Sequence, residues 1–174
     1  NRIAREFGKE YDEGGEIANN GSIDYDLLSD LNSIDYYSQS YPKSLGREWI
    51  NENFWYRVRQ SEAGKEDRMK TLVDHIGQQI GENIEQLAED SSTARVYVTG
   101  GGAFNPTLVD HLRTHTDAEI IVPDAQVIEY KEALIFGLLA VLRVQNKTNI
   151  LKSYTGAEND SVSGELAGNF SHLV

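Results

Sequence analysis

Apolar residues recur at three- and four-residue steps over residues 65–89, and this is the clearest pattern in the chain. Such spacing puts the apolar side chains on one face of a helix, so we predict a long helix with that face against a core. Gly77 and Gly81 lie one turn apart in it, and each costs a helix roughly 1 kcal/mol relative to alanine. We therefore expect another element to pack closely on that side. The apolar stripe comprises Met69, Leu72, Val73, Ile76, Ile80, Ile84 and Leu87.

Two short apolar runs follow, and a helical pattern comes after each. Residues 94–100 (ARVYVTG) predict a buried strand, and residues 118–123 (AEIIVP) predict a second one. Between them Asn105 suits the N-cap of a helix and Pro106 its first position. Residues 129–144 are apolar nearly all round and predict a buried helix. The order strand, helix, strand, helix predicts an α/β fold with a parallel or mixed sheet.

The first part of the chain is less regular. A short helix is predicted over residues 24–31 and another from about Gly46, so residues 1–64 form a mostly helical and loop part and residues 65–174 the α/β part of one domain. Because the chain begins with Asn rather than Met, in what resembles the end of a helix, we expect it to be a piece of a longer protein.

Composition narrows the function classes. The chain has 174 residues, with 16 basic and 28 acidic side chains, which give a formal net charge of −12. A net anion argues against general nucleic-acid binding, because phosphate backbones repel it. No run approaches the roughly 18 apolar residues of a membrane helix. The absence of cysteine excludes disulfides and thiolate metal sites.

Three consecutive glycines, Gly100, Gly101 and Gly102, separate the first predicted strand from the helix that Asn105 would cap. Backbone N–H groups at a helix N-terminus attract anions, and glycine lets a phosphate or a flat base approach the backbone. The segment matches neither the Walker A nor the GxGxxG pattern. It is either a nucleotide-binding loop or a tight strand-to-helix turn.

Other motifs leave their own alternatives open. His111 and His115 could share a helix face, but their segment offers no convincing third ligand, so we predict no metal site. Residues 43–48 could hold an anion between Lys43 and Arg47, or could form a helix N-terminus capped by Ser44. Glu132 is either exposed at a helix start, where the helix dipole favours it, or directed into a cleft.

Four motifs, in order, carry a resemblance to a known family. They are YPKSLGREW, VYVTGGGAFNPTLVDHL, EYKEALIFGLLA and SYTGAENDSVSG. In this order and spacing the chain resembles the C-terminal half of the anhydro-N-acetylmuramic acid kinases, which belong to the superfamily of sugar kinases, actin and heat-shock ATPases. The resemblance implies the C-terminal lobe of a ribonuclease-H-like, actin-like ATPase fold, with extra helices.

The family's activity follows as an expectation. The resemblance implies ATP- and magnesium-dependent phosphorylation of 1,6-anhydro-N-acetylmuramic acid with opening of its anhydro ring, in cytoplasmic cell-wall recycling. Partners would be the amino sugar, ATP and the protein's own N-terminal lobe, and a homodimer is one arrangement that the resemblance allows. No nucleic-acid or membrane partner is expected.

Residue roles also follow from the resemblance. Glu132 falls on the position of an acidic residue that reaches the sugar. The residues expected to contact the nucleotide are Gly100, Gly101, Gly102 and Asn105. The residues expected to line the cleft are Lys43, Ser44, Arg47, Glu48, Thr155 and Gly156.

The sequence departs from the family pattern in two ways. The Gly-Thr-Ser and Asp-Gly phosphate motif and the catalytic aspartate are absent, and Lys131 precedes Glu132 where many relatives carry Gly-Asp or Gly-Asn. We therefore expect no catalytic residue in this chain and no kinase activity from its 174 residues alone. The alternatives are a non-catalytic ATP-binding or interaction module, or a sugar kinase of the same superfamily with another substrate.

Overall fold

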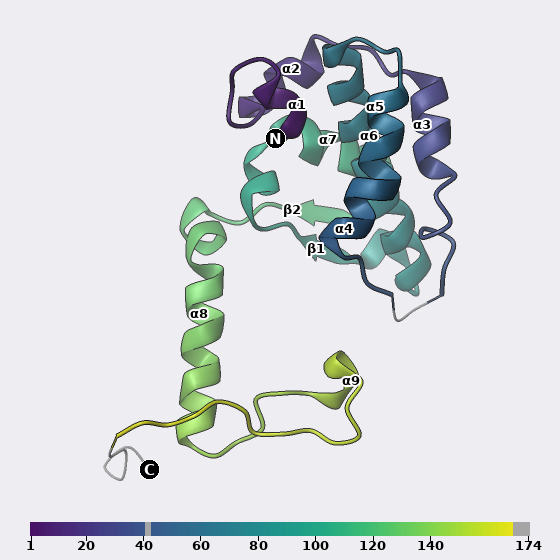
Figure 1. Cartoon of the computed structure of the whole chain (residues 1–174). Coiled ribbons are helices and arrows are strands. Elements are labelled where there is room, and N and C mark those ends of the chain that lie inside the picture. Colours follow the sequence, from purple (N-terminus) through teal and green to yellow (C-terminus); the bar gives the residue numbers. More distant parts are fainter. Residues whose placement is uncertain (41–42, 169–174) are drawn as a thin grey trace. The chain divides into compact units, whose positions relative to one another are not determined.

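The computed structural model describes residues 1–40 and 43–168 (Figure 1). The sequence features at Tyr41, Pro42 and His172 lie outside these residues. The chain forms two compact units, Asn1–Pro123 and Asp124–Val174, and each is described by itself. The predicted division after residue 64 stays a prediction about one domain.

The first unit is mostly helical with a small sheet. Its short N-terminal elements precede one long helix, and its strands flank a nine-residue helix. The elements are α1 (Arg2–Arg5), η1 (Glu13–Gly15), α2 (Glu16–Asn19), α3 (Tyr25–Asn32), α4 (Arg47–Trp49), the π-helical turn η2 (Ile50–Phe54), α5 (Trp55–Gln60), α6 (Lys65–Leu87), η3 (Ser91–Thr93), β1 (Arg95–Tyr97), η4 (Gly101–Phe104), α7 (Pro106–Thr114) and β2 (Glu119–Ile121).

The long helix α6 confirms the clearest prediction from the sequence. It packs against α1, α2, α3 and α7, and its first half carries the buried side chains of Met69, Leu72 and Val73. The predicted stripe is wrong further along, where Ile76 and Ile80 are exposed. The side of α6 that is buried instead carries Thr71, Asp74, Gly77 and Gly81. The buried face of the helix therefore differs from its most apolar face.

The main core lies among the helices of the first unit. The predicted helix over residues 24–31 is present as α3, one residue later at each end, and the carboxylate of Asp24 caps it by accepting a hydrogen bond of 2.7 Å from the amide of Leu27. This cap satisfies an amide that the helix itself leaves without an acceptor. The buried core comprises Ile3, Ala4, Ile17, Ala18, Leu27, Leu31, Ile34, Val58, Met69, Leu72 and Val73.

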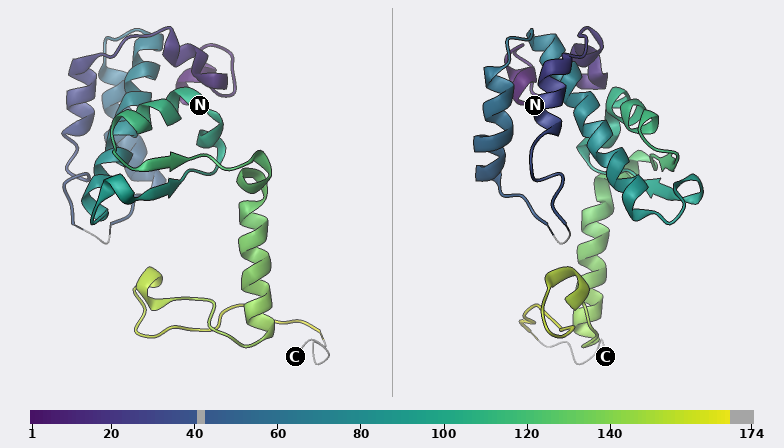
Figure 2. Two further views of the ribbon diagram at one scale, coloured as in Figure 1. Left: turned by 180° about the vertical axis from the view of Figure 1, so that it is seen from behind. Right: turned by 90° about the vertical axis from the view of Figure 1, so that its right-hand side faces the viewer.

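Strands β1 and β2 form a parallel pair connected by α7. Val96 lies opposite Ile120, and Figure 2 shows the two strands side by side. Apolar residues of α7 and the strands make a second, smaller core cluster around Val109 and Leu112. The α/β class and both strands are confirmed, but β1 is not the buried strand that the sequence predicts, because Arg95 and Tyr97 are exposed.

The second unit consists of helix α8 (Ala125–Val144), the short helix α9 (Lys152–Thr155) and loops joined by an antiparallel bridge between Ile150 and Ser161. The helix predicted over residues 129–144 is present as α8, but it is largely exposed and not buried as predicted. Leu134 is 74% exposed and Phe136 is 69% exposed. Up to residue 168, where the described part of this unit ends, only one four-residue helix and loops accompany the twenty residues of α8. In the described part of the chain, no helix combines the length and apolarity needed to span a membrane.

Candidate functional site

The glycine segment forms an open loop between β1 and α7. Gly100 has φ of 84° and begins the single turn η4, which Ala103 anchors as its buried residue. Gly100, Gly101 and Gly102 are exposed. A Cβ added at Gly100 or Gly101 would meet no described atom within 4 Å, and at Gly102 it would meet only Leu108 Cδ2, at 3.4 Å. The protein therefore leaves the space beside this backbone free for a ligand.

Asn105 and Pro106 begin α7 as the sequence predicts. Asn105 Oδ1 accepts a hydrogen bond of 3.2 Å from the amide of Leu108, and Pro106 occupies the first helical turn. Because the cap uses Oδ1, the group that Asn105 can offer a ligand is its Nδ2 donor. Thr107 holds the helix start in place, since its hydroxyl accepts from Asn19 and donates to the carbonyl of Gly14.

Backbone donors define the chemistry of this loop. The amides of Ala103 and Asn105 are used within the turn, where they donate to the carbonyls of Gly100 and Gly102. The first amides of a helical turn have no acceptor within it, and here they belong to Gly101 and Gly102. Exposed amides without side chains suit phosphate oxygens. These amides are donors, so they suit an anion rather than a cation.

Lys43 is engaged by its own loop. Its Nζ donates to the carbonyls of Tyr36 and Tyr37 at 3.2 and 3.0 Å and lies 4.9 Å from the centre of the Tyr36 ring. Lys43 also lines an open hollow beside α6, and neither Gly100 nor any other residue of the glycine loop is among the residues that line it. In this structure the ammonium group stabilises the turn at Tyr36 and Tyr37.

The neighbours of Lys43 are exposed and begin a helix. Ser44, Arg47 and Glu48 all face solvent. The helix starts at Arg47 with Gly46 at its N-cap position, so the alternative in which Ser44 caps this helix is wrong. The described contacts of Lys43 are with Tyr36 and Tyr37, and none of them involves Arg47.

Glu132 belongs to the second unit, in α8, and is exposed. The helix begins at Ala125, four residues before the predicted start. Glu132 therefore lies two turns into the helix, beyond the first turn in which the helix dipole stabilises a carboxylate. Of the two interpretations of this residue, the dipole explanation is wrong.

The late TGA turn closes α9. The Thr155 hydroxyl donates to the carbonyl of Leu151 at 3.2 Å, and Gly156 has φ of 72° at the C-cap. A positive φ favours glycine at the end of a helix. Both residues are exposed in the second unit. Their hydroxyl and backbone groups are thus accessible, and a role in ligand binding stays a prediction.

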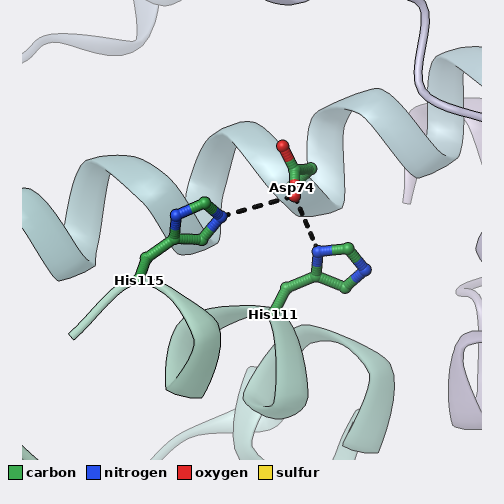
Figure 3. A group of neighbouring side chains, drawn as sticks. All are labelled: Asp74, His111 and His115. Atoms are coloured by element: carbon green, nitrogen blue, oxygen red, sulfur yellow. Dashed lines mark hydrogen bonds and ion pairs between the residues drawn. The ribbon is translucent and has the colours of Figure 1, made fainter. Parts of the chain in front are cut away.

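A cluster that the sequence did not predict joins α6 to α7. Asp74 Oδ1 lies 2.8 Å from His111 Nδ1 and 3.4 Å from His115 Nε2 (Figure 3). Asp74 on α6 is therefore the third potential ligand, which the segment around His111 and His115 does not itself contain. One signal was available, because Asp74, Gly77 and Gly81 follow helical spacing and share the face on which a close neighbour was expected.

The buried polar residue His75, next to Asp74 on α6, serves the core. It is 1% exposed, its Nδ1 lies 2.7 Å from Asn32 Oδ1, and its Nε2 lies 2.9 Å from the hydroxyl of Tyr37. Since an amide oxygen only accepts, Nδ1 carries the proton and Nε2 accepts from Tyr37. Burial lowers the pKa of His75 to about 4, against a smaller opposing effect of Asp74. The ring is therefore neutral at pH 7.

Comparisons with known proteins agree with the motifs. Residues 1–168 match the family model described as anhydro-N-acetylmuramic acid kinase. Proteins named anhydro-N-acetylmuramic acid kinase from Mannheimia succiniciproducens and Shewanella loihica are 34% and 33% identical, each over 91% of this chain and over 45% and 44% of their own length. One from Burkholderia orbicola is 34% identical over 93% of the chain and 44% of its own length.

The extent of these matches defines what they establish. The chain spans less than half the length of the curated relatives it matches. The family model nevertheless covers nearly every residue, including the glycine loop, Glu132 and the TGA turn. The chain therefore belongs to the anhydro-N-acetylmuramic acid kinase family.

Proposed function

We propose that this chain is the C-terminal part of an ATP-dependent kinase that phosphorylates 1,6-anhydro-N-acetylmuramic acid. The γ-phosphoryl group of ATP is transferred to O6 of the sugar, water adds at C1, and the anhydro bond between C1 and O6 breaks. The products are N-acetylmuramic acid 6-phosphate and ADP. The family match over residues 1–168 carries this proposal. Because the reaction serves recycling of cell-wall sugars with ATP, we place the protein in the cytoplasm.

The glycine loop is the proposed contact with ATP. Its support is the free space beside Gly100 and Gly101, together with the amides at the start of η4. These amides bind phosphate or ribose oxygens, and Asn105 adds its Nδ2 donor. Magnesium would supply charge neutralisation on the phosphates. We assign magnesium binding to the phosphates of ATP.

Further ligand contacts are proposed for each unit by itself. We propose that the exposed carboxylate of Glu132 accepts hydrogen bonds from sugar hydroxyls. In the second unit, Thr155 and Gly156 are proposed cleft-lining residues. In the first unit, the same role is proposed for the exposed side chains of Ser44, Arg47 and Glu48, while Lys43 supports their loop through the Tyr36 and Tyr37 carbonyls.

The N-terminal lobe is the proposed partner of α8. Exposed Leu134 and Phe136 give this helix an apolar surface that the second unit does not cover. In a ribonuclease-H-like kinase of two lobes, ligands bind between the lobes, and the general base lies in the other lobe. Phosphoryl transfer depends on positioning and charge stabilisation from both sides. The 174-residue chain alone is therefore inactive.

A kinase assay of the full-length protein tests the proposal. With magnesium, ATP and 1,6-anhydro-N-acetylmuramic acid, mass spectrometry should detect N-acetylmuramic acid 6-phosphate and an equal amount of ADP. The 174-residue chain, assayed in parallel, should give none. Activity with another sugar and none with the anhydro sugar would assign a different substrate, and ATP binding without phosphorylation of any sugar in a panel would indicate a non-catalytic module. Turnover by the 174-residue chain would contradict its predicted inactivity.

A further inference from the structure

Three metal-ligating side chains meet where α6 and α7 pack together. Asp74 Oδ1 faces both His111 Nδ1 and His115 Nε2, and in Figure 3 both imidazoles point at the one carboxylate. The three ligand atoms all lie within 4.8 Å of one another. The cluster belongs to the first unit and is separate from the glycine loop, because α7 carries the histidines at its C-terminal end and the loop at its N-terminal end.

Tight helix packing fixes this arrangement. Gly77 and Gly81 let the backbone of α7 approach α6. A Cβ added at Gly77 would lie 3.0 Å from the His111 carbonyl carbon, and one added at Gly81 would lie 2.4 Å from the His115 carbonyl oxygen. Asp74 is only 7% exposed. A carboxylate so nearly buried is costly unless positive charge or donors compensate it. The two imidazoles are the groups that supply this compensation.

The geometry suits a tetrahedral metal ion. Zinc bonds of 2.0–2.1 Å place neighbouring ligand atoms about 3.3 Å apart. Two of the three spacings, 2.8 and 3.4 Å, lie close to this value. The third pair, the two imidazole nitrogens, lies within 4.8 Å, so the rings would adjust towards a common ion on binding. Two imidazoles and a carboxylate are a donor set typical of zinc and other divalent transition metals, and three protein ligands leave one position for water. We propose that Asp74, His111 and His115 form a binding site for a divalent transition-metal ion, with zinc as the preferred ion.

Lys70 controls access to this site. Its Nζ lies 2.9 Å from His111 Nε2, so the ammonium group donates to that nitrogen and the ring donates from Nδ1 to Asp74. Metal binding at Nδ1 requires the other tautomer, with the proton on Nε2. The half-buried Lys70 side chain must then turn away. Lys70 therefore competes with the metal, and removing its charge should strengthen metal binding.

Bound metal would connect two helices of the first unit. A ligand that binds only the folded state stabilises it in proportion to the logarithm of its concentration above Kd. Because α7 follows the glycine loop directly, a metal ion on α6 and α7 would also fix the helix from which the loop extends. This inference does not depend on the proposed kinase reaction.

Zinc titration of the purified protein tests the site. The protein carries no histidine tag and is treated with a chelator and dialysed before calorimetry with ZnCl₂. We expect one zinc ion per chain, and Co²⁺ should give the visible absorption bands of a four-coordinate site. MgCl₂ should give no comparable heat. Zinc binding with a stoichiometry well below one, or absence of the cobalt bands, would overturn the proposal.

Variants assign the binding to these residues. Asp74→Asn and His115→Gln should each weaken zinc binding by at least about tenfold, whereas Lys70→Met should strengthen it severalfold. Asp110→Asn is the matched control, because this carboxylate is also on α7 but pairs with Arg113. Circular dichroism shows whether each variant folds. Should Asp74→Asn not fold, the more exposed His115→Gln decides, and unchanged affinity in that variant would overturn the assignment.

Discussion

Gly81 of α6 lies directly against the backbone of His115 at the end of α7. A Cβ added at Gly81 would come within 2.4 Å of the His115 carbonyl oxygen, closer than real Cβ atoms approach backbone. The equivalent contact of Gly77, with the backbone of His111 and Leu112, is 3.0 Å. These two glycines, unfavourable for an isolated helix, therefore determine how closely α6 and α7 pack.

Gly81→Ala should destabilise the first unit in spite of the better helix propensity of alanine. Overpacking typically costs about 1–3 kcal/mol, and a 2.4 Å approach to backbone puts Gly81→Ala at the upper end of this range, above the gain of roughly 1 kcal/mol from propensity. Urea unfolding followed by circular dichroism measures the change. Gly77→Ala serves as the graded comparison and should cost less. Equal or greater stability of Gly81→Ala would contradict the close contact.

The buried His75 predicts a pH dependence of stability. Its pKa is lowered to about 4 in the folded protein by burial, from an ordinary value of 6.5. Between these values the unfolded chain binds more protons than the folded one, so the stability that neutral His75 provides is complete above pH 6.5 and falls as the pH drops towards 4. One such group contributes up to about 1.4 kcal/mol per pH unit. Urea unfolding at several pH values measures the slope.

His75→Gln provides the control for this pH dependence. Glutamine keeps a donor and an acceptor near Asn32 and Tyr37 but does not titrate. The variant should be less stable at pH 7 and should show a shallower loss of stability between pH 6.5 and 4. If its slope equals that of the original protein, another group causes the acid sensitivity.

The fold was predictable where local patterns decide it. Helix α6, the cap of α7 at Asn105 and the start of α3 at Asp24 follow from spacing and capping preferences within single segments. Burial was not predictable in the same way. Ile76 on α6 is apolar and exposed, and so are Leu134 and Phe136 on α8, because an apolar pattern within one segment does not determine which other segments cover it.

The candidate site shows the same division. The glycine loop could be found from consecutive residues, since strand, glycines and helix start are all local. The cluster at Asp74 could not, because Asp74 and His111 are 37 residues apart and meet only through the crossing of two helices. The sequence nevertheless predicted that another element packs closely against α6 at Gly77 and Gly81, and the structure confirms this contact.

Gly101→Val should impair ATP use without affecting folding. A branched Cβ at this position meets no described protein atom within 4 Å, so the change mainly blocks ligand approach to the backbone. Loss of one hydrogen bond to a charged phosphate weakens binding affinity by about 10- to 100-fold. In the full-length enzyme we expect the KM for ATP to rise by about this factor, with an intermediate effect of Gly101→Ala.

Two measurements separate the possible results for the glycine loop. Thermal unfolding should be unchanged in Gly101→Val, which excludes a folding defect. The KM for the sugar should also change little. Unchanged ATP kinetics in a folded variant would show that Gly100–Gly102 is a tight turn without a role in nucleotide binding.

Glu132→Gln should weaken sugar binding in the full-length enzyme. The substitution keeps the size of this exposed side chain and removes its charge, and a lost hydrogen bond to a carboxylate corresponds to about tenfold or more in the KM for the sugar. The KM for ATP should stay the same. Glu129→Gln, one turn earlier on α8, is the matched control. If both variants raised the KM for the sugar equally, the effect would come from the overall charge of α8 and not from a contact of Glu132.

The apolar surface of α8 predicts a difference between the isolated chain and the full-length protein. Leu134 is 74% exposed, so Leu134→Ser should change the stability of the 174-residue chain by little more than its helix propensity, roughly 0.5 kcal/mol. In the full-length protein, where we propose that this surface packs against the N-terminal lobe, the same change should cost about 2–5 kcal/mol, as for a buried leucine. Gln126→Ser, also exposed on α8, controls for propensity and should cost the same small amount in both proteins. Urea unfolding of both variants, each in the 174-residue chain and in the full-length protein, decides. An equally small effect of Leu134→Ser in the full-length protein would show that the N-terminal lobe does not cover α8.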